Sequence, residues 1–282
     1  MTPFDVQAHR GGAGLWPENT LEAFGRALAL GVSTLELDVH LTAQDDVVVA
    51  HDPTLHGSGL ADARRIRELT RADLPPTMPL LRQVAALLED RGADQVRINL
   101  EIKYDALDAA GLTSREAFVA KVVDALRIDR LVGRTSIQCF DWGVLARVGE
   151  AEPALARNLL VSPRYLRATA GAPSAWFDGL AVGADFVRTA AAEGFTAISP
   201  IHGSPFASGV GDPAYTPFAT ADLVERAHGE GLAVIPYVVD DEATMRHLVR
   251  LGVDGLITNR PDRLREVLVA EGRGVPPSFP RP

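Results

Sequence analysis

Two carboxylates lie two residues apart on an apolar stretch, and a His-Asp pair follows a short polar turn. In ELDVHLTAQDDVVVAHD, residues 36–52, Glu36 and Asp38 alternate with Leu37 and Val39. Side chains two residues apart on a strand share a face. If the leucine and valine pack on helices, the carboxylates point inward, which is costly without a partner. By itself this pattern fits a solvated strand edge as well as a cation site.

Two further apolar stretches end in groups of the same kind. FDVQA at 4–8 runs into His9 and Arg10, and VRINLEIK at 96–103 ends with Glu101 and Lys103 on one face. Neighbouring carboxylates repel unless a positive charge lies between them. With Glu101 and His51 added, a metal site becomes the better interpretation. A set of oxygen ligands at Glu36, Asp38 and Glu101 favours Ca²⁺ or Mg²⁺ over zinc.

The elements that must position these groups alternate along the chain. Apolar, β-branched stretches predict strands at 4–8, 33–41, 96–103, 135–140, 156–161, 195–201, 233–239 and 255–258. Amphipathic stretches predict helices at 18–30, 79–90, 115–126, 142–149, 184–194, 220–231, 241–252 and 262–270. This alternation predicts an α/β protein, a (β/α)₈ TIM barrel of one domain. An open, doubly wound sheet is the alternative, but HRGGAG after the first strand is no dinucleotide fingerprint.

Some segments depart from simple alternation. Residues 42–52 predict a small hairpin extension after strand two, and 53–78 form a charged connection containing proline. Residues 162–182 are an irregular stretch. We assign the barrel to residues 1–270 and a flexible, Pro-rich tail to 271–282, because EGRGVPPSFPRP cannot hold a helix.

The motifs together resemble a known family. AHRGGAGLWPENTLEAFGRAL, ELDVHLT, VAHDPTL, NLEIK and GVDGLITNRPD resemble the glycerophosphodiester phosphodiesterases, in order from His9 to Pro261. The likeness is strongest through residue 55. The resemblance implies a TIM barrel that uses a divalent metal to hydrolyse glycerophosphodiesters to glycerol 3-phosphate and an alcohol.

The resemblance also implies roles for single residues. His9 and His51 would act as general acid and base, and we favour His51 as the acid. Glu36, Asp38 and Glu101 would bind the metal, Ca²⁺ or Mg²⁺, and Arg10 and Lys103 the phosphate. Glu18 and Asn19 would lie near the phosphate. We add Asn19, Tyr237 and His202 as substrate contacts, since His202 ends a predicted strand. His40 and His56 flank the site and could add ligands, but we expect them at the surface.

The chemistry needs this set of residues. A phosphodiester is anionic, so a metal and a base such as Arg10 must neutralise its oxygens. The nucleophile must lose a proton and the leaving alkoxide must gain one, tasks that two histidines can share. The nucleophile can be water or a neighbouring substrate hydroxyl that forms a cyclic phosphate. The sequence does not distinguish these routes.

Departures from the family pattern leave other functions open. HGSGLADARRIREL after the His-Asp pair is shorter than the usual turn, and Tyr237 replaces a common tryptophan. One alternative is a lysophospholipase D-like enzyme on the same barrel, with Leu15, Trp16 and Trp176 lining an apolar entry. Another is a barrel that binds without catalysis, which would not need so many polar groups in one pocket.

Composition narrows the partners. The chain has 282 residues, 46% of them hydrophobic, with 37 acidic against 28 basic residues and a formal charge of −9. Nothing resembles a basic face, so we expect a small-molecule substrate and no nucleic acid. With the single Cys139, no signal-peptide pattern and no long apolar span, we expect a cytoplasmic protein without stable membrane insertion. The sequence does not indicate an oligomeric state.

Overall fold

The central feature of the computed structural model is a nearly closed barrel of parallel strands. It describes residues 3–55, 64–108, 113–167, 173–206 and 208–280. The strands follow the order β12-β9-β8-β7-β6-β2-β1-β13. Their bounds are β1 Asp5–Ala8, β2 Thr34–Leu41, β6 Arg97–Ile102, β7 Thr135–Cys139, β8 Ala156–Val161, β9 Ala197–Pro200, β12 Ala233–Val234 and β13 Gly255–Thr258. Each lies within a predicted strand or coincides with one.

Hydrogen bonds join the two ends of this strand order. The backbone N–H of Asp254 donates to Val234 O at 2.9 Å, and that of Ile257 donates to Pro236 O at 3.0 Å. The N–H of Val239 donates to Ile257 O at 3.0 Å. These bonds connect the chain after β12 to β13, which an open sheet would leave apart. The predicted TIM barrel is therefore confirmed, and the open-sheet alternative is excluded.

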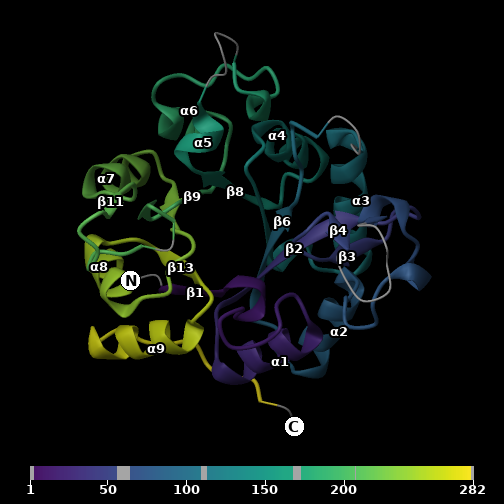
Figure 1. Ribbon diagram of the computed structural model, residues 1–282, viewed down its shortest axis with the longest axis horizontal. Coiled ribbons are helices and arrows are strands. Elements are labelled where there is room, and N and C mark those ends of the chain that lie inside the picture. Colours follow the sequence, from purple (N-terminus) through teal and green to yellow (C-terminus); the bar gives the residue numbers. More distant parts are fainter. Residues whose placement is uncertain (1–2, 56–63, 109–112, 168–172, 207, 281–282) are drawn as a thin grey trace.

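Helices surround the strands, as Figure 1 shows. They are α1 Leu21–Leu30, α2 Leu81–Asp90, α3 Arg115–Ile128, α4 Trp142–Ala151, α5 Pro163–Leu166, α6 Phe186–Ala192, α7 Ala221–Gly229, α8 Glu242–Leu251 and α9 Pro261–Ala270. Every predicted helical stretch overlaps one of them; α3 and α4 each run two residues further, α9 begins one residue earlier, and α5 is a short extra turn. The side chains of Thr220 and Asp241 accept backbone N–H groups at the starts of α7 and α8, as N-cap residues do.

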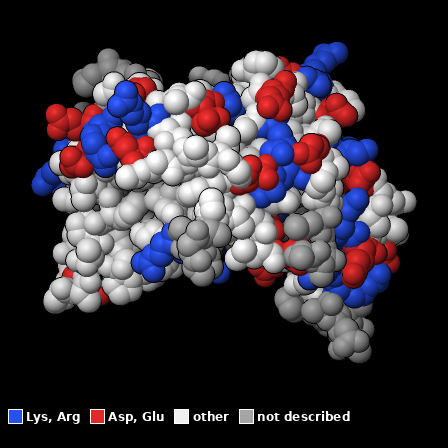
Figure 2. All heavy atoms as spheres, turned by 90° about the horizontal axis from the view of Figure 1, so that it is seen from above, with Lys and Arg blue, Asp and Glu red and all other residues white. Residues whose placement is uncertain are grey.

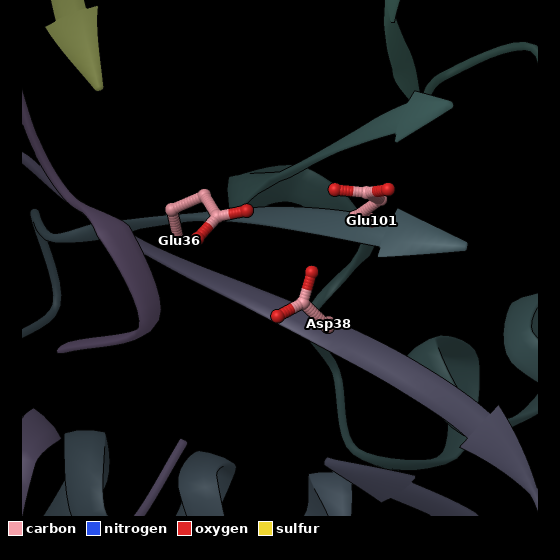
Figure 3. A group of neighbouring side chains, drawn as sticks. All are labelled: Glu36, Asp38 and Glu101. Carbon is pink, nitrogen blue, oxygen red and sulfur yellow. The ribbon is translucent and has the colours of Figure 1, made fainter. Parts of the chain in front are cut away.

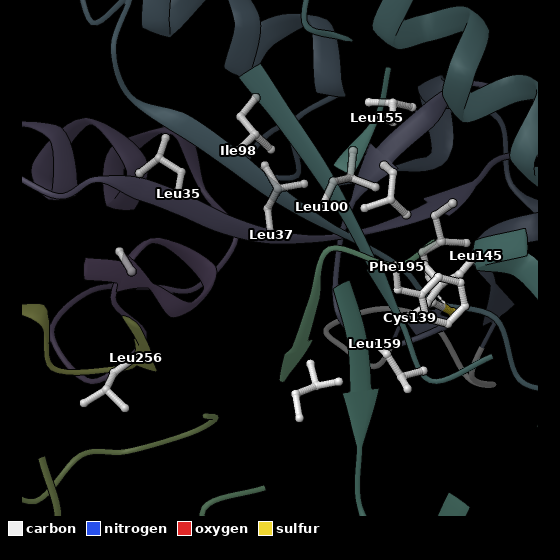
Figure 4. Close-up of a cluster of buried hydrophobic side chains, with 14 of the residues drawn as sticks. Leu35, Leu37, Ile98, Leu100, Cys139, Leu145, Leu155, Leu159, Phe195 and Leu256 are labelled. Carbon is white, nitrogen blue, oxygen red and sulfur yellow. Dashed lines mark hydrogen bonds between the residues drawn. The ribbon is translucent and has the colours of Figure 1, made fainter. Parts of the chain in front are cut away.

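Alternation along the strands separates the core from the site. Leu35 and Leu37 of β2 and Ile98 and Leu100 of β6 are fully buried and lie in the hydrophobic cluster shown in Figure 4. The intervening side chains of these two strands are polar and point to the barrel interior. Truncating one such buried leucine to alanine costs about 2–5 kcal/mol. The apolar layer thus fixes the strands that carry the site.

The predicted hairpin extends β2. Strand β3, Val47–Val49, pairs antiparallel with β2, with His40 opposite Val48. The following connection has a small hydrophobic core of its own, made by Val48, Ala50, Ile66, Leu69, Leu74 and Leu80. It contains a ladder of β4, Thr54–Leu55, with β5, Arg64–Arg65, and 3-10 turns at η2, Ile66–Glu68, and η3, Arg71–Asp73. This small core includes Val48 of the hairpin and so stabilises it.

The remaining elements are short. They are the 3-10 turns η1 His9–Gly11, η4 Val132–Arg134 and η5 Ala175–Phe177, and a hairpin of β10 Gly203–Ser204 with β11 Thr216–Pro217 that the sequence did not predict. Beyond α9, residues 271–280 carry no helix or strand. The N–H of Phe279 donates to Leu28 O at 2.8 Å, and Arg265 Nη1 donates to Pro276 O at 2.7 Å. Flexibility of this tail stays a prediction, but its described part lies against α1.

Candidate active site

Three buried carboxylates meet at the carboxyl ends of β2 and β6. Glu36 and Asp38 are fully buried and Glu101 nearly so. Asp38 is the direct neighbour of Glu101 in the strand register, so their side chains leave the barrel wall side by side. One oxygen from each of the three lies within 4.8 Å of the others. Figure 3 shows the three carboxylate groups turned toward one another.

Two cations partly neutralise this cluster. Lys103 Nζ lies 2.9 Å from Glu101 Oε1 and 3.5 Å from Asp38 Oδ1. Arg10 Nε lies 3.2 Å from Asp38 Oδ2, and the Arg10 backbone N–H donates to Glu36 Oε2 at 2.9 Å. Three negative groups thus face two positive side chains, which leaves negative charge for a further cation.

The pKa values of the three carboxyl groups reflect this excess of negative charge. Burial and the charges of Asp38 and Glu101 hold the pKa of Glu36 well above its usual range. Burial raises the pKa of Glu101 to about 7 although Lys103 opposes the change. Asp38 is different: burial acts to raise its pKa, but Lys103 and Arg10 outweigh it and hold the pKa at about 2. Without a further cation, two of the three carboxylates resist ionisation.

The donor set fits a hard divalent cation. Asp38 Oδ1 and Asn19 Oδ1 are buried and make no hydrogen bond to any described residue. Buried polar atoms rarely remain unsatisfied, so each of these two oxygens is available to a further ligand; Asp38 Oδ1 has only Lys103 Nζ nearby, at 3.5 Å. Carboxylate and amide oxygens are the ligands that Ca²⁺ and Mg²⁺ prefer. The residues present therefore suit the metal that the sequence implied.

The turn after β1 is held in an uncommon conformation. Arg10 and Asn19 have φ of 51° and 55°, in the left-handed region that L-residues rarely adopt. The Asn19 backbone N–H donates to Arg10 O at 2.9 Å, and Asn19 Nδ2 donates to Asp38 Oδ2 at 2.9 Å. Arg10 Nη1 also pairs with Glu18 at 2.9 Å. Such strain concentrates at functional sites, and here it directs both side chains onto the carboxylate cluster.

His9 is positioned by residues at the other end of the chain. Its Nδ1 lies 2.6 Å from Asn259 Oδ1. Asn259 Nδ2 donates to Asp240 Oδ2 and the Asn259 backbone N–H to Asp240 Oδ1, both at 2.8 Å. Since a carboxylate only accepts, this bond fixes the amide, and its oxygen must accept from His9 Nδ1–H. The Nε2 of neutral His9 is then free of a proton, 4.0 Å from Glu36 Oε2.

His51 follows the hairpin and has a different partner. Its Nδ1 donates to Asp52 Oδ1 at 2.7 Å, and its backbone carbonyl accepts from His40 Nε2 at 3.0 Å. Burial lowers the pKa of both catalytic candidates, that of His9 to about 4, with Arg10 adding to it. The two imidazoles differ in that Asp52 can stabilise a proton on His51, whereas the amide of Asn259 offers His9 no charge.

Two cavities open at these residues. The smaller, about 160 Å³, is lined by His9, Arg10, Glu36, Tyr237 and Phe206, among others. The larger, about 280 Å³, extends past Phe140 to Tyr165 and Trp176. Their linings share His51, Glu101, Lys103 and Phe140. A substrate with two arms on one central charged group could therefore place the centre at the junction and one arm in each cavity.

Comparison with known proteins agrees with this arrangement. Residues 9–263 match the Glycerophosphoryl diester phosphodiesterase family. The chain belongs to this family. A glycerophosphodiester phosphodiesterase from Bacillus altitudinis is 27% identical over 271 residues, which cover 92% of this chain and 95% of that protein.

Solved structures share the fold. A protein from Silicibacter pomeroyi, provisionally named for the same family, has 25% identity and a TM-score of 0.79, covering 97% of this chain and 95% of that one. A phosphodiesterase from Oleispira antarctica, solved with the product sn-glycerol-3-phosphate, has 19% identity and a TM-score of 0.70, with 94% and 96% covered. Family membership makes this chain a phosphodiesterase.

The family's motifs meet as the sequence implied, with exceptions among the added substrate contacts. Tyr237 lines the smaller cavity, and its hydroxyl donates to Val161 O at 3.3 Å. Asn19 contacts Asp38 and does not line that cavity. His202 lies apart from both cavities: it is 2% exposed, and its Nδ1 lies 3.1 Å from the Tyr215 hydroxyl of the β10–β11 hairpin. The geometry therefore gives the predicted substrate contact of His202 no support.

One surface assignment was wrong. His40 is buried, because the hairpin covers it and offers the His51 carbonyl as an acceptor. Burial lowers its pKa to about 4, so it is neutral at physiological pH. It positions His51 through the backbone. His56, placed at the surface with it, lies outside the described residues.

Sequence reasoning missed several residues of the site. Gln138 Nε2 donates to Glu36 Oε1 at 2.6 Å and so orients that carboxylate. Gln138 alternates with Ile137 and Cys139 on β7, and that alternation could have marked it as inward-facing. Asn259 lies in the motif GVDGLITNRPD, but nothing local indicated its bond to His9 or its bonds to Asp240, because His9 is distant in sequence.

Proposed function

We propose that the chain hydrolyses glycerophosphodiesters to sn-glycerol 3-phosphate and an alcohol, with a divalent metal and two histidines as acid and base. The observation that carries this proposal is the junction of the two cavities. There a cluster of three buried carboxylates lies between His9 and His51, beside Arg10 and Lys103. The product bound to the Oleispira antarctica enzyme of similar fold supports the choice of substrate class.

Glu36, Asp38 and Glu101 would hold the metal, with Asn19 Oδ1 as a further oxygen beside Asp38. When bound, a Ca²⁺ or Mg²⁺ ion supplies positive charge to the non-bridging oxygens of the phosphate. Arg10 and Lys103 add charge to the same oxygens from the protein side. An anionic substrate needs this local positive charge, because the chain as a whole carries −9.

His9 and His51 would divide the proton transfers. His9 Nε2, left unprotonated by the Asn259 contact, takes the proton of the attacking oxygen as that oxygen bonds to phosphorus. The bond between phosphorus and the alcohol oxygen then breaks. His51, in its imidazolium form with Nδ1–H held by Asp52, donates its Nε2 proton to the departing oxygen and becomes neutral. Water or a neighbouring hydroxyl of the substrate can be the nucleophile, since both need the same base.

Product analysis tests this function. Purified protein is supplied with glycerophosphocholine, glycerophosphoethanolamine, glycerophosphoglycerol and a lysophospholipid, with Mg²⁺ or Ca²⁺ present. We expect sn-glycerol 3-phosphate from at least one glycerophosphodiester, and loss of that product in a Glu36→Gln variant that remains folded. No release from any diester, or unchanged release by Glu36→Gln, would refute the proposal.

The lysophospholipid arm addresses the second candidate, a lysophospholipase D-like activity. The smaller cavity includes the apolar side chains of Leu160, Val238 and Ile257, and Phe206 at its edge is 64% exposed. An exposed aromatic side chain beside an apolar lining could accept the start of an acyl chain. Faster cleavage of the lysophospholipid than of glycerophosphocholine would favour this second function.

A further inference from the structure

Beyond its junction with the smaller cavity, the larger cavity takes no part in the chemistry described above. It holds about 280 Å³ and joins the smaller cavity at His51, Lys103 and Phe140. If His51 protonates the departing oxygen, the alcohol that leaves lies on the His51 side of the phosphorus. The larger cavity opens on that side, so it is where the alcohol part of the substrate would lie.

Three aromatic rings from separate segments form one wall of this cavity. Phe140 follows β7, Tyr165 lies in α5 and Trp176 in η5. The ring centres of Phe140 and Tyr165 are 4.1 Å apart, and those of Tyr165 and Trp176 are 4.7 Å apart. All three rings are half-buried and therefore accessible from the cavity. Aromatic faces attract cations, ammonium groups of ligands included.

The wall already accepts a cation on one ring. The Arg164 guanidinium lies 5.5 Å from the centre of the Tyr165 ring. Asp105 lines the same cavity as the Tyr165 ring. The rings of Phe140 and Trp176 make no contact with a cation among the described residues.

Among the carboxylates that line the cavity, Asp52 is bonded to His51 at 2.7 Å, and Asp105, which is exposed, has no ion-pair partner among the described residues. Arg65 pairs with Asp108, Arg67 pairs with Asp45 at 2.7 Å, and Lys103 pairs with Glu101. Asp105 lines the cavity and makes no ion pair within the described part of the chain; its Oδ1 accepts only the Leu107 N–H, at 2.9 Å. Among the residues that line the cavity, the unpaired charge beside the aromatic wall is therefore negative; Arg164 contacts the Tyr165 ring but does not line the cavity.

We propose that this cavity binds the alcohol part of the substrate and selects a quaternary ammonium head group of the choline type. The inference rests on the proposed function, because it needs a phosphodiester at the junction. A trimethylammonium group carries a positive charge without N–H donors, so it suits ring faces and a nearby carboxylate better than it suits a pocket of polar donors. A neutral polyol would give the Asp105 carboxylate no cation to pair with, and an anionic head group would be repelled by it.

Kinetics with paired substrates test the proposal. The wild type should show a kcat/KM for glycerophosphocholine about tenfold above that for glycerophosphoglycerol, which corresponds to about 1.4 kcal/mol and lies within the range of a partly desolvated cation–π contact. Asp105→Asn and Trp176→Leu should remove most of this preference by lowering only the glycerophosphocholine value. Trp176→Phe should retain it, because a ring face remains.

Asp212→Asn is a matched control. Asp212 is exposed, and its Oδ1 accepts the Ala214 N–H at 2.8 Å, the same local contact that Asp105 makes. Asp212 lines neither cavity, so its variant should leave both substrates unchanged. A defect shared by Asp105→Asn and Asp212→Asn would come from the loss of the turn contact and would contradict the proposal.

Choline inhibition gives an independent readout. Choline should compete with substrate in the wild type and less well in Asp105→Asn. Equal cleavage of both diesters by the wild type, a preference for glycerophosphoglycerol, or equal losses on both substrates in Asp105→Asn would each overturn the inference. The proposed function would survive these outcomes, because it fails only if no diester is cleaved.

Discussion

At the scale of single residues, the partners of the two histidines distinguish the roles that we propose for them. His9 Nδ1 faces an amide oxygen that is fixed by Asp240, whereas His51 Nδ1 faces the carboxylate of Asp52. An amide partner favours neutral imidazole with a basic Nε2, and a carboxylate partner favours imidazolium. These partners support the proposal that His51 is the acid, which the sequence analysis favoured without a structural reason.

Replacing either histidine by alanine should lower kcat by roughly 10²-fold or more, since positioned proton transfer is worth about that much. A p-nitrophenyl phosphodiester separates the two, because its leaving group needs no proton. His51→Ala should recover much of its rate on that substrate and His9→Ala should not. Near-normal turnover of glycerophosphodiesters by both variants would contradict the two-histidine mechanism, and recovery by His9→Ala alone would reverse the roles.

The raised pKa of Glu101 makes a prediction about pH. A carboxyl whose folded pKa lies near 7 contributes stability below its unfolded pKa of about 4.5 and loses it as pH rises to about 7. His9, with a folded pKa of about 4, has the opposite slope over part of this window, so a single protein would not isolate the effect. In metal-free buffer, Glu101→Gln should therefore gain in melting temperature relative to wild type between pH 4.5 and pH 7.

Thermal unfolding followed by circular dichroism across that range measures the difference. The attraction of Lys103 is already included in the Glu101 pKa of about 7, so the pH dependence of the difference follows the ionisation of Glu101. Added Mg²⁺ or Ca²⁺ should raise the wild-type melting temperature more at pH 8 than at pH 5, since the ion competes with protons for the carboxylates. A difference between the two proteins that does not change with pH would contradict the assignment.

At the scale of elements, the turn between β1 and α1 must pack closely to place His9 and Arg10. Gly11 has a φ of 84°, and a Cβ there would lie 2.8 Å from Ala23 Cβ and 3.0 Å from Phe24 Cδ1. Gly11→Ala should lose about 2 kcal/mol or more of unfolding free energy from strain and overpacking, with reduced kcat because the turn shifts.

Gly133→Ala is the control for this variant. A Cβ at Gly133 would meet nothing within 4 Å, and its φ lies outside the left-handed region. It should change stability and activity little, as chemical denaturation and turnover can show. Equal tolerance of the two substitutions would mean that the turn is not as tightly packed as the structure indicates.

The elements were predictable from the sequence because strand and helix periodicity agreed with local signals such as Thr220 and Asp241. The inward face of β2 was predictable from the alternation of Glu36 and Asp38 with leucine and valine. The same alternation puts His40 on the inward face, where we had not expected it. Its burial is tolerated because the covering hairpin supplies the His51 carbonyl as a hydrogen-bond acceptor. Contacts between distant segments leave no local pattern in the sequence. The contact of His9 with Asn259 and the aromatic wall could therefore be found only in the folded barrel.

At the scale of the whole molecule, barrel closure brings together groups from both ends of the chain. Residues of β1 and β2 meet those after β13 only because the strand order returns on itself. Figure 2 shows basic and acidic side chains interspersed on the face it presents, which suits a small substrate captured by local charge. Among the described helices, none has the length and apolar character to cross a bilayer.

The central claim is that a divalent cation bound by Glu36, Asp38 and Glu101 supports hydrolysis of a glycerophosphodiester. Its most direct test is the release of sn-glycerol 3-phosphate by protein stripped of metal with a chelator, then titrated with Mg²⁺ or Ca²⁺. The account predicts almost no release after stripping, recovery that saturates as one of these ions is added, and no recovery in Asp38→Asn. Full activity of the stripped protein, unchanged by either ion, would contradict it.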